Sequence, residues 1–276
     1  MSITKAIIPV AGWGTRRLPI TKAVEKCMLP IGNRPIVDYI VEDCVRAGIT
    51  DIYFVINDTE HSQLKDYYGD NAQIAKFLTD KNAIDKLELL DTTPAGVNFH
   101  YTVQPSGRYG TAVPVALVVK EFNLNEQVVM RNGDDPFWNV PSGSEVKNMI
   151  ESIINEDESV TVGATKPIDE MSKYGMLDVA DGLLQRIVEK PSIENVTSTL
   201  ANINCSVLSA SLLTTIVNYV DSHDFGPTDQ EYMITDPISE YLDNGGRIRV
   251  LAATGEWLDS GSLEGWLNAN KVICGS

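Results

Sequence analysis

Cysteine and histidine are scarce in this chain of 276 residues. It has four cysteines and three histidines. The cysteines are widely separated and include no Cys-x-x-Cys pair: Cys27, Cys44, Cys205 and Cys274. Neither a disulfide framework nor a structural zinc site is indicated, because both need cysteines at short or repeated spacings. We therefore expect free thiols.

Basic side chains and long apolar runs are also limited. Lys and Arg number 22 against 38 Asp and Glu, which gives a formal net charge of -16 at pH 7. This charge repels nucleic acid, so we expect no nucleic-acid partner and only a local phosphate site. No run of about 18 apolar residues could span a bilayer, and no basic segment leads into an apolar run at the amino terminus. The sequence predicts a cytoplasmic protein with no membrane partner.

Short apolar runs alternate with segments of helical length. Strands are predicted at residues 4–11, 51–56, 97–103, 126–130 and 159–164. Helices are predicted at residues 35–47, where apolar side chains recur at near-helical spacing, and at residues 111–122. This alternation indicates an α/β fold with a mostly parallel sheet flanked by helices. In such sheets ligands bind beyond the carboxyl ends of the strands.

The pattern changes in the second half of the chain. Two strand-like runs within residues 176–189 flank Asp181-Gly182, which predicts a hairpin and hence a small antiparallel insertion. Earlier in the chain, residues 71–90 mix charges with apolar side chains and predict a surface helix packed on one side. No repeat or linker divides the sequence, so we expect a single domain over residues 1–276.

The segment after the first strand combines glycine with arginine. Residues 11–19 read Ala-Gly-Trp-Gly-Thr-Arg-Arg-Leu-Pro. Backbone amides there can approach a phosphate chain while guanidinium groups neutralise it. A nicotinamide enzyme is disfavoured because its fingerprint needs a third glycine where Arg17 stands, and the spacing of a P-loop is absent. A tight turn with solvated arginines is the structural alternative.

Further motifs follow this glycine loop. Gly-Thr-Arg at residues 14–16, Thr-Lys-Ala at 21–23 and Lys-x-Met-Leu-Pro at 26–30 lead into Arg-Pro-Ile at 34–36. Together they resemble the signature of bacterial UTP-glucose-1-phosphate uridylyltransferases, part of the sugar nucleotidyltransferase superfamily. Related thymidylyltransferases usually lack the Thr-Lys-Ala element, which favours the uridylyl branch. The resemblance extends over nearly the whole chain and implies a Rossmann-like sheet.

The resemblance implies roles in binding the nucleotide. It places the nucleotide on four residues of the glycine loop: Ala11, Gly12, Gly14 and Thr15. Arg16 would hold the triphosphate, and Lys26 would bridge the reacting phosphates, although Lys26 is otherwise read as a solvated loop charge. Residues 1–135 would form mainly the nucleotide-binding half. Residues 136–276 would form mainly the sugar-binding half and the carboxyl-terminal helix.

Acidic side chains stand where a metal-bound phosphate could reach them. Asp134 and Asp135 follow the apolar run at residues 128–130, at the end of a predicted strand. In the family, the first of these paired acids holds magnesium and the second faces the sugar hydroxyls. Asp259, in a Trp-x-Asp-x-Gly element, would be the second magnesium ligand. Turn formation is the alternative for the paired acids, and helix capping is the alternative for Asp259.

The resemblance also implies a sugar pocket. Glu189 and Lys190 belong to a Glu-Lys-Pro element at the end of the predicted hairpin. Lys190 would grip the sugar phosphate and take part in catalysis, and Glu189 would accept hydrogen bonds from sugar hydroxyls. Tyr174 and Gly175 match the Tyr-Gly of the same pocket, where the backbone approaches the sugar ring. Taken alone, Glu-Lys-Pro is common surface sequence.

Two stretches depart from the family pattern. Gln104 would hydrogen-bond the uracil edge and Gly110 would lie beside the base, but Arg108 stands where relatives usually keep a glycine and the spacing is shorter. Asn-Cys-Ser at residues 204–206 replaces a stretch usually written Gly-Arg-Tyr. The base and the sugar are therefore less firmly indicated than the reaction.

These observations predict a magnesium-dependent transfer from UTP to glucose 1-phosphate, giving UDP-glucose and pyrophosphate. The second pKa of a phosphate monoester is about 6, so the attacking group is mostly dianionic and needs no general base. In-line attack at the α-phosphorus needs alignment and positive charge, which Arg16, Lys26, Lys190 and Mg²⁺ would supply. The alternatives are a thymidylyltransferase that uses dTTP and a non-catalytic regulator that binds nucleotide sugars. By analogy with relatives, we expect a homodimer or homotetramer.

Overall fold

The computed structural model describes residues 2–57, 62–195, 198–226 and 230–275. A nine-stranded sheet has the order β5-β4-β1-β6-β11-β8-β12-β10-β9. Its strands, in chain order, are β1 (Lys5–Pro9), β4 (Asp51–Asn57), β5 (Asn98–Gln104), β6 (Val128–Arg131), β8 (Ser159–Thr165), β9 (Gly175–Ala180), β10 (Leu183–Glu189), β11 (Leu200–Leu208) and β12 (Ile248–Ala252). Two smaller pairs join β2 (Pro30–Ile31) to β3 (Arg34–Pro35) and β7 (Phe137–Trp138) to β13 (Glu256–Trp257).

Strand direction confirms the predicted mostly parallel sheet, in which some of the strand pairs are antiparallel. β5, β4, β1 and β6 are mutually parallel, and β8 and β12 are parallel to each other. β11 runs antiparallel to both β6 and β8, so β8 has the direction of β6. The predicted hairpin is β9 and β10, joined at Asp181 and Gly182, whose φ angles of 51° and 76° suit a tight turn between twisted strands. It continues the main sheet at its edge.

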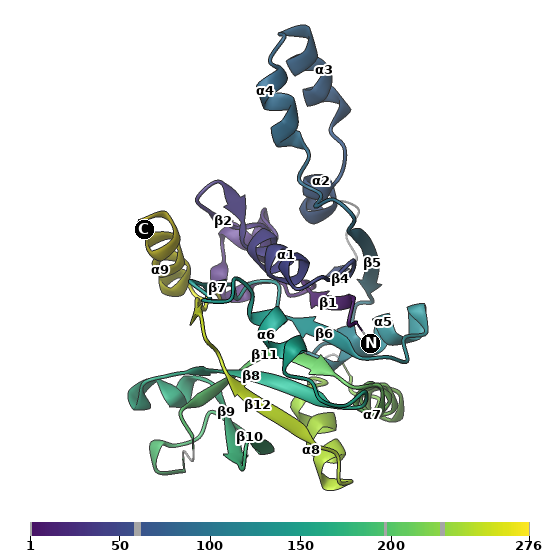
Figure 1. Cartoon of the computed structure of the whole chain (residues 1–276), viewed down its shortest axis with the longest axis vertical. Helices are drawn as coiled ribbons and strands as arrows, with labels where there is room; N and C mark the ends of the chain where they lie inside the picture. Colours follow the sequence, from purple (N-terminus) through teal and green to yellow (C-terminus); the bar gives the residue numbers. More distant parts are fainter. Residues whose placement is uncertain (1, 58–61, 196–197, 227–229, 276) are drawn as a thin grey trace.

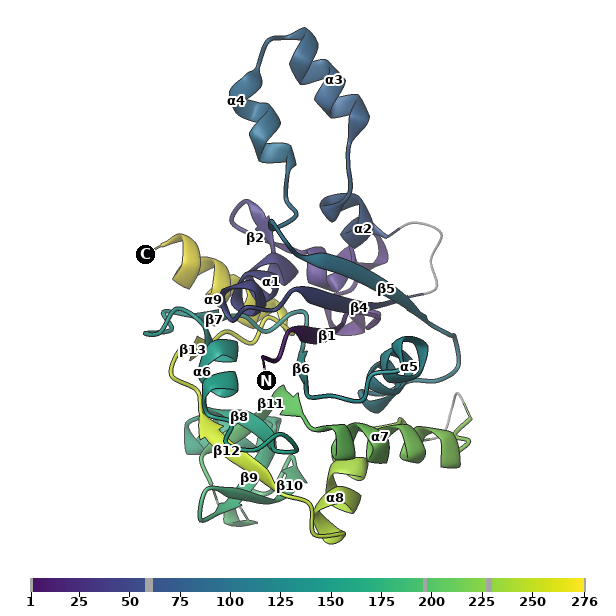
Figure 2. The same ribbon diagram turned by 45° about the vertical axis from the view of Figure 1, so that its right-hand side comes forward.

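Helices cover both faces of the sheet (Figures 1 and 2). They are α1 (Ile36–Arg46), α2 (Gln63–Tyr68), α3 (Ala72–Asp80), α4 (Ile84–Leu87), α5 (Ala112–Phe122), α6 (Glu145–Glu151), α7 (Ala210–Ser222), α8 (Thr235–Asp243) and α9 (Leu263–Cys274). Short 3-10 turns include η1 (Thr15–Arg17), η2 (Ile20–Lys22), η3 (Lys26–Met28), η4 (Glu88–Leu90), η5 (Ile168–Lys173) and η6 (Ile193–Asn195). No helix of the described residues has the length and apolar character needed to cross a membrane.

Side chains of successive residues in the central strands pack into two separate hydrophobic cores, one on each face of the sheet. Ile7 of β1 packs in the core that contains residues of α5, α7 and α8, whereas its neighbour Ile8 packs in the core that contains residues of α1 and α6. Val128 and Val129 of β6 divide between the two cores in the same way. Successive strand side chains point to opposite faces, so a run that is apolar at every position is buried on both sides.

The prediction of a surface helix at residues 71–90 was right in its helical, exposed character and wrong in expecting one helix packed on one side. The segment forms α3 and α4, two short helices that extend away from the rest of the molecule in Figures 1 and 2. No residue within either helix is buried. The spacing of its apolar side chains is that of a helix. The two helices lie beyond the edge of the sheet, however, so no strand in the described part of the chain covers these side chains.

Candidate functional site

The site forms where the neighbouring parallel strands β1 and β6 end. The glycine loop follows β1, and residues 132–135 follow β6. Parallel neighbours present their carboxyl ends at the same edge of the sheet, so the two segments meet.

Gly14 shapes the glycine loop. Its φ and ψ of 61° and 34° lie in the left-handed region, where glycine has no steric cost. A Cβ at this position would stand 2.9 Å from Thr21 Cγ2 and 3.1 Å from Lys26 Cβ. The Thr21 hydroxyl donates to the Gly14 carbonyl over 2.9 Å. Thr21 therefore folds back onto the loop, and the side chain of Lys26 packs close to Gly14.

Arg17 connects the glycine loop to the carboxyl-terminal segment. The residue is buried, and its guanidinium donates to the carbonyl oxygens of Ser262 over 2.7 Å and Ser260 over 3.4 Å. Burial lowers the pKa of Arg17. This connection holds Asp259 close to the loop that follows β1.

Asp259 is not a helix cap. Ser262 caps α9 by accepting a hydrogen bond from the Gly265 amide over 3.0 Å. Asp259 instead accepts from the Gly261 amide over 2.9 Å and from the Tyr174 hydroxyl over 3.2 Å. The capping alternative for Asp259 is therefore excluded.

Lys26 and Asp134 form a close ion pair in this site. Burial would lower the pKa of Lys26, but the charges of Asp134, Asp135 and Asp259 outweigh it and raise the pKa. The ammonium group thus stays protonated. The same influences show that all three carboxylates lie near Lys26.

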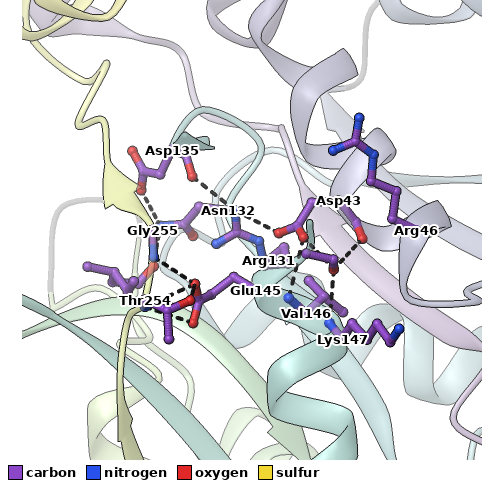
Figure 3. Close-up of polar contacts among 12 residues, drawn as sticks. Asp43, Arg46, Arg131, Asn132, Asp135, Glu145, Val146, Lys147, Thr254 and Gly255 are labelled. Atoms are coloured by element: carbon purple, nitrogen blue, oxygen red, sulfur yellow. Dashed lines mark hydrogen bonds and ion pairs between the residues drawn. The ribbon is translucent and has the colours of Figure 1, made fainter. Parts of the chain in front are cut away.

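Asp135 is buried behind this ion pair. Its carboxylate accepts a hydrogen bond from the Asn132 amide over 3.0 Å, and its backbone carbonyl accepts from Arg131 Nη2 over 3.0 Å (Figure 3). Burial, followed by repulsion from Asp134, raises the pKa of Asp135 to about 8, although the Asn132 hydrogen bond acts in the opposite direction. The site therefore disfavours a second carboxylate charge beside Asp134.

Most of the predicted catalytic and sugar-binding residues share one cleft of about 870 Å³. It is lined by eight of the predicted residues: Arg16, Lys26, Asp134, Asp135, Tyr174, Gly175, Glu189 and Asp259. Gly175 pairs with Glu189 across the β9–β10 hairpin, and a Cβ at Gly175 would stand 2.8 Å from Glu189 Oε1. The glycine leaves room for that carboxylate at the cleft wall.

Seven predicted residues are not among those that line the cleft: Ala11, Gly12, Gly14, Thr15, Gln104, Gly110 and Lys190. The first four belong to the glycine loop beside Arg16, and a Cβ at Gly12 would meet nothing within 4 Å. Lys190 is exposed, and its amide donates to the Tyr174 carbonyl over 3.0 Å. The roles assigned to these residues stay predictions.

The predicted base-binding residues contact their own loop. Gln104, at the end of β5, donates through Nε2 to the Arg108 carbonyl over 2.8 Å. Gly110 has a φ of 120°, and a Cβ there would stand 2.3 Å from the Tyr232 carbonyl oxygen. The Tyr232 backbone hydrogen-bonds on both sides of this glycine, to Tyr109 and to Ala112. Close backbone approach alone thus accounts for glycine at position 110.

Several residues of the cleft were missed by sequence reasoning. Lys166 follows β8 directly and lines the cleft, as do Lys173 and Glu170 from η5. Asn202 lines it from β11, next to Asn204, which belongs to the stretch already noted as departing from the family pattern. A polar residue directly after a predicted parallel strand is the signal that could have found Lys166.

No group of three or more His, Cys, Asp or Glu side chains within the described ranges is arranged to hold a metal ion by itself. Asp134 and Asp259 nevertheless both face the cleft and approach Lys26. A hard cation such as Mg²⁺ often takes only one or two protein carboxylates and completes its shell with substrate phosphates and water.

Comparison with known proteins agrees with this geometry. The family model described as nucleotidyl transferase matches residues 5–275. A UTP–glucose-1-phosphate uridylyltransferase of Streptococcus pneumoniae is 34% identical over 220 residues, which cover 76% of this chain and 72% of that protein. A putative enzyme of the same name from Methanocaldococcus jannaschii is 31% identical over 98% of this chain and 93% of its own length.

Solved structures of proteins with related names have the same fold. The UTP-bound UGPase of Acinetobacter baumannii superposes with a TM-score of 0.85 at 27% identity and covers 97% of this chain and 92% of its own. A UDP-glucose pyrophosphorylase complexed with UDP-glucose superposes with a TM-score of 0.80 at 26% identity and covers 99% of each chain.

Proposed function

This chain belongs to the nucleotidyl transferase family, and on that premise we propose that it transfers the uridylyl group of UTP to glucose 1-phosphate. The products are UDP-glucose and pyrophosphate. The observation that carries the proposal is the convergence of Arg16, Lys26, Asp134 and Asp259 on one cleft at the ends of parallel strands. Relatives that carry this enzyme name match nearly the full chain.

The reaction needs little beyond alignment and charge. A phosphate oxygen of glucose 1-phosphate forms a bond to the α-phosphorus of UTP, and the bond from that phosphorus to the bridging oxygen breaks. Pyrophosphate leaves with the electron pair. We propose that Lys26 contacts the phosphates, because its ammonium is paired with Asp134 in the cleft that Asp259 also lines. Arg16 is exposed in the glycine loop, where its guanidinium can bind the triphosphate.

Magnesium fits the residues present. Asp134, Asp135 and Asp259 line the same cleft as Lys26, and burial followed by repulsion from Asp134 and Asp259 raises the pKa of Asp135. Oxygen ligands with surplus negative charge suit a hard divalent cation. We propose Asp134 and Asp259 as its ligands. When bound, Mg²⁺ would offset the negative charge of the phosphates, and Asp134 would then face the metal as well as Lys26.

The remaining assignments are part of the same proposal. Residues 1–135 carry the glycine loop and form mainly the nucleotide half. Residues 136–276 carry Tyr174, Glu189 and α9 and form mainly the sugar half. Gln104 and Gly110 at the base, Lys190 at the sugar phosphate, a homo-oligomeric state and a cytoplasmic location stay predictions.

A substrate panel tests the function. Purified protein with Mg²⁺ is incubated with each of UTP and dTTP, paired with glucose 1-phosphate and with other sugar 1-phosphates, and released pyrophosphate is measured. We expect the highest kcat/KM for UTP with glucose 1-phosphate. A preference for dTTP would instead assign a thymidylyltransferase, and no release from any pair would contradict an enzymatic role. Heat-denatured protein and reactions without Mg²⁺ are the controls.

A further inference from the structure

A set of hydrogen bonds joins the turn that carries Lys26 to helix α2. Gln63, the first residue of α2, donates through its side-chain Nε2 to the Ala23 carbonyl over 3.1 Å. The oxygen of the same side chain accepts a hydrogen bond from the Glu25 backbone amide over 2.9 Å. The Glu25 carboxylate in turn accepts a hydrogen bond from the Leu64 amide over 3.1 Å. We call these three hydrogen bonds the α2 clamp, and they fix the chain immediately before Lys26.

The residue after Lys26 is fixed on α2 as well. Cys27 is buried in the same hydrophobic core as Leu64 and Tyr68 of α2. Lys26 itself begins η3, a 3-10 turn of three residues. A 3-10 turn has poorer hydrogen-bond geometry than an α-helix, so contacts with the rest of the fold hold it in place. The backbone of Lys26 is therefore held on both sides by α2, and its side chain lines the cleft.

The side chain of Lys26 depends on this support. A lysine ammonium is carried on a flexible aliphatic stem, so a small change in backbone direction moves the charge a long way. The stem starts close to the glycine loop, because a Cβ at Gly14 would stand 3.1 Å from Lys26 Cβ. It ends at the ion pair with Asp134. Both contacts require that the backbone presents the side chain in one direction.

The α2 clamp also determines where the Glu25 carboxylate points. It accepts from an amide in the first turn of α2, where the unpaired amides of the helix stabilise negative charge. Glu25 is not among the residues that line the cleft. A carboxylate released from α2 could turn toward the phosphates that Lys26 contacts, where like charges would repel each other. The clamp therefore holds a cation in the cleft and an anion outside it.

We propose that Glu25 and Gln63 are positioning residues that hold the Lys26 ammonium in place for the phosphates of the substrates. This inference rests on the proposed function, in which Lys26 contacts those phosphates, and deepens it by naming what fixes the lysine. Neither Glu25 nor Gln63 lines the cleft, so both act through Lys26. The clamp also couples the site to α2, from which the chain continues into α3 and α4.

Substitution of Glu25 tests the clamp. Glu25→Ala removes the acceptor of the Leu64 amide, whereas Glu25→Gln keeps an oxygen in its place. For Glu25→Ala we expect kcat to fall about 10–100-fold and KM for UTP to change by less than about 3-fold, because a misplaced cation stabilises the transition state less. Glu25→Gln should keep kcat within about 3-fold. A purely structural role would lower the unfolding temperature of Glu25→Ala and leave kcat within about 3-fold while the protein is folded, and this result would overturn the proposal.

Gln63 provides a second substitution and a test of coupling. Gln63→Met removes both hydrogen bonds of this side chain and should also lower kcat about 10–100-fold. The double variant with Glu25→Ala should lose no more than about 3-fold beyond the larger single loss, because residues that act as a unit are not additive. Losses that multiply would contradict a shared action through Lys26.

A helix cap outside the clamp provides the matched control. Asn71 caps α3 by accepting a hydrogen bond from the Ile74 amide over 3.0 Å. Asn71→Ala therefore removes a side-chain acceptor of a helix amide, as Glu25→Ala does, but leaves the clamp intact. Its kcat should stay within about 2-fold of the unsubstituted protein. Circular dichroism and thermal unfolding show whether each variant has folded at the assay temperature.

Chemical labelling of Lys26 keeps this inference distinct from the proposed function. Brief treatment with acetic anhydride, followed by mass spectrometry, compares Lys26 with Lys147, an exposed lysine of α6 outside the cleft. In Glu25→Ala we expect Lys26 to be acetylated at least about 3-fold faster relative to Lys147, because release of the turn exposes the amine to the reagent. If the unsubstituted protein releases no pyrophosphate but this change is found, the proposed reaction fails and the positioning role stands. An unchanged labelling ratio would show that Glu25 does not position Lys26, whatever happens to kcat.

Discussion

Arg131 and Asp43 face each other in the interior, with Arg131 Nη2 3.9 Å from Asp43 Oδ2. Arg131 ends β6 and is fully buried, while Asp43 comes from α1 and is 8% exposed. Arg131 also donates to the Asp135 carbonyl, and Asp43 accepts a hydrogen bond from Ser144, which caps α6 (Figure 3). The pair thus connects the turn that carries Asp134 and Asp135 to helices α1 and α6 behind it.

We expect loss of either charge in this pair to destabilise the protein. Asp43→Asn keeps an oxygen for Ser144 but leaves Arg131 buried without a counter-charge. Such a change costs about 3 kcal/mol, because an unpaired charge is far more expensive to bury than the pair. Arg131→Met should cost a similar amount. Urea unfolding at 25 °C, fitted to a two-state transition, measures both.

The double variant decides whether the charges act as a pair. With both charges removed, we expect the loss to be smaller than the sum of the single losses by about 2 kcal/mol. Arg46→Met, which removes a surface pair with Glu42 on the same helix, should change stability by less than about 1 kcal/mol. Additive effects of the two buried substitutions would show that Arg131 and Asp43 contribute independently.

Tyr174 should influence the metal requirement through Asp259. Its hydroxyl donates to Asp259 Oδ2 over 3.2 Å, so Tyr174→Phe removes an orienting partner of a proposed ligand. Loss of such a partner typically weakens metal binding or activity about 10–100-fold. We expect the Mg²⁺ concentration at half-maximal activity to rise by about 10-fold, measured as pyrophosphate release at saturating substrates.

A matched tyrosine provides the control for this change. Tyr219→Phe removes a hydroxyl that donates to Asp236 over 2.7 Å, away from the cleft. It should leave the Mg²⁺ dependence unchanged. If Tyr174→Phe also leaves the Mg²⁺ dependence unchanged, Asp259 is not a metal ligand oriented by this hydroxyl.

The sequence predicted the parts of the site that are local. The glycine loop, residues 134–135 and the hairpin turn at Asp181-Gly182 each depend on a few neighbouring residues, and each lies where its pattern indicated. Lys166 was missed because the aromatic ring nearest its ammonium, that of Trp257, comes from a distant part of the sequence. Periodicity carries no information about such contacts.

The burial of the Arg131 charge could not be predicted from the sequence either. Arg131 follows three apolar residues of β6 and reads as a solvated strand end, yet it is fully buried. The reason is its partner on α1, which only the packing of that helix reveals. The arm formed by α3 and α4 shows the converse: its apolar pattern is helical, but amphipathicity alone does not specify whether the chain returns to cover it.

The thiols should differ sharply in reactivity. Cys27, Cys44 and Cys205 are buried and Cys274 is exposed. Burial raises the pKa of all three buried thiols, that of Cys205 to about 11, so the reactive thiolate is rare at pH 8. We expect Ellman's reagent to titrate one thiol in the native protein and all four in guanidinium chloride. In Cys274→Ser the native signal should vanish, and rapid reaction of a second thiol would contradict the buried positions.

The contribution of Glu158 to stability should depend on pH. Burial would raise the pKa of Glu158, but hydrogen bonds from the Ile154 amide and Arg249 outweigh it, so the pKa is lowered from 4.5. Arg249 Nη2 lies 2.6 Å from Glu158 Oε1. Because the folded pKa is below the unfolded one, this stabilisation is fully present above about pH 4.5 and is lost as the pH falls through the folded pKa.

Glu158→Gln should therefore lower the free energy of unfolding by about 1–2 kcal/mol at pH 7. The difference from the unsubstituted protein should shrink as the pH falls below about 4.5, where Glu158 becomes protonated in both states. Denaturant unfolding at pH 7, 5, 4 and 3 measures this dependence. Glu151→Gln, whose partner Lys147 lies 3.7 Å away at the surface, should have almost no effect at any pH. A Glu158→Gln difference that stayed constant from pH 7 to pH 3 would show that the carboxylate charge does not stabilise the fold.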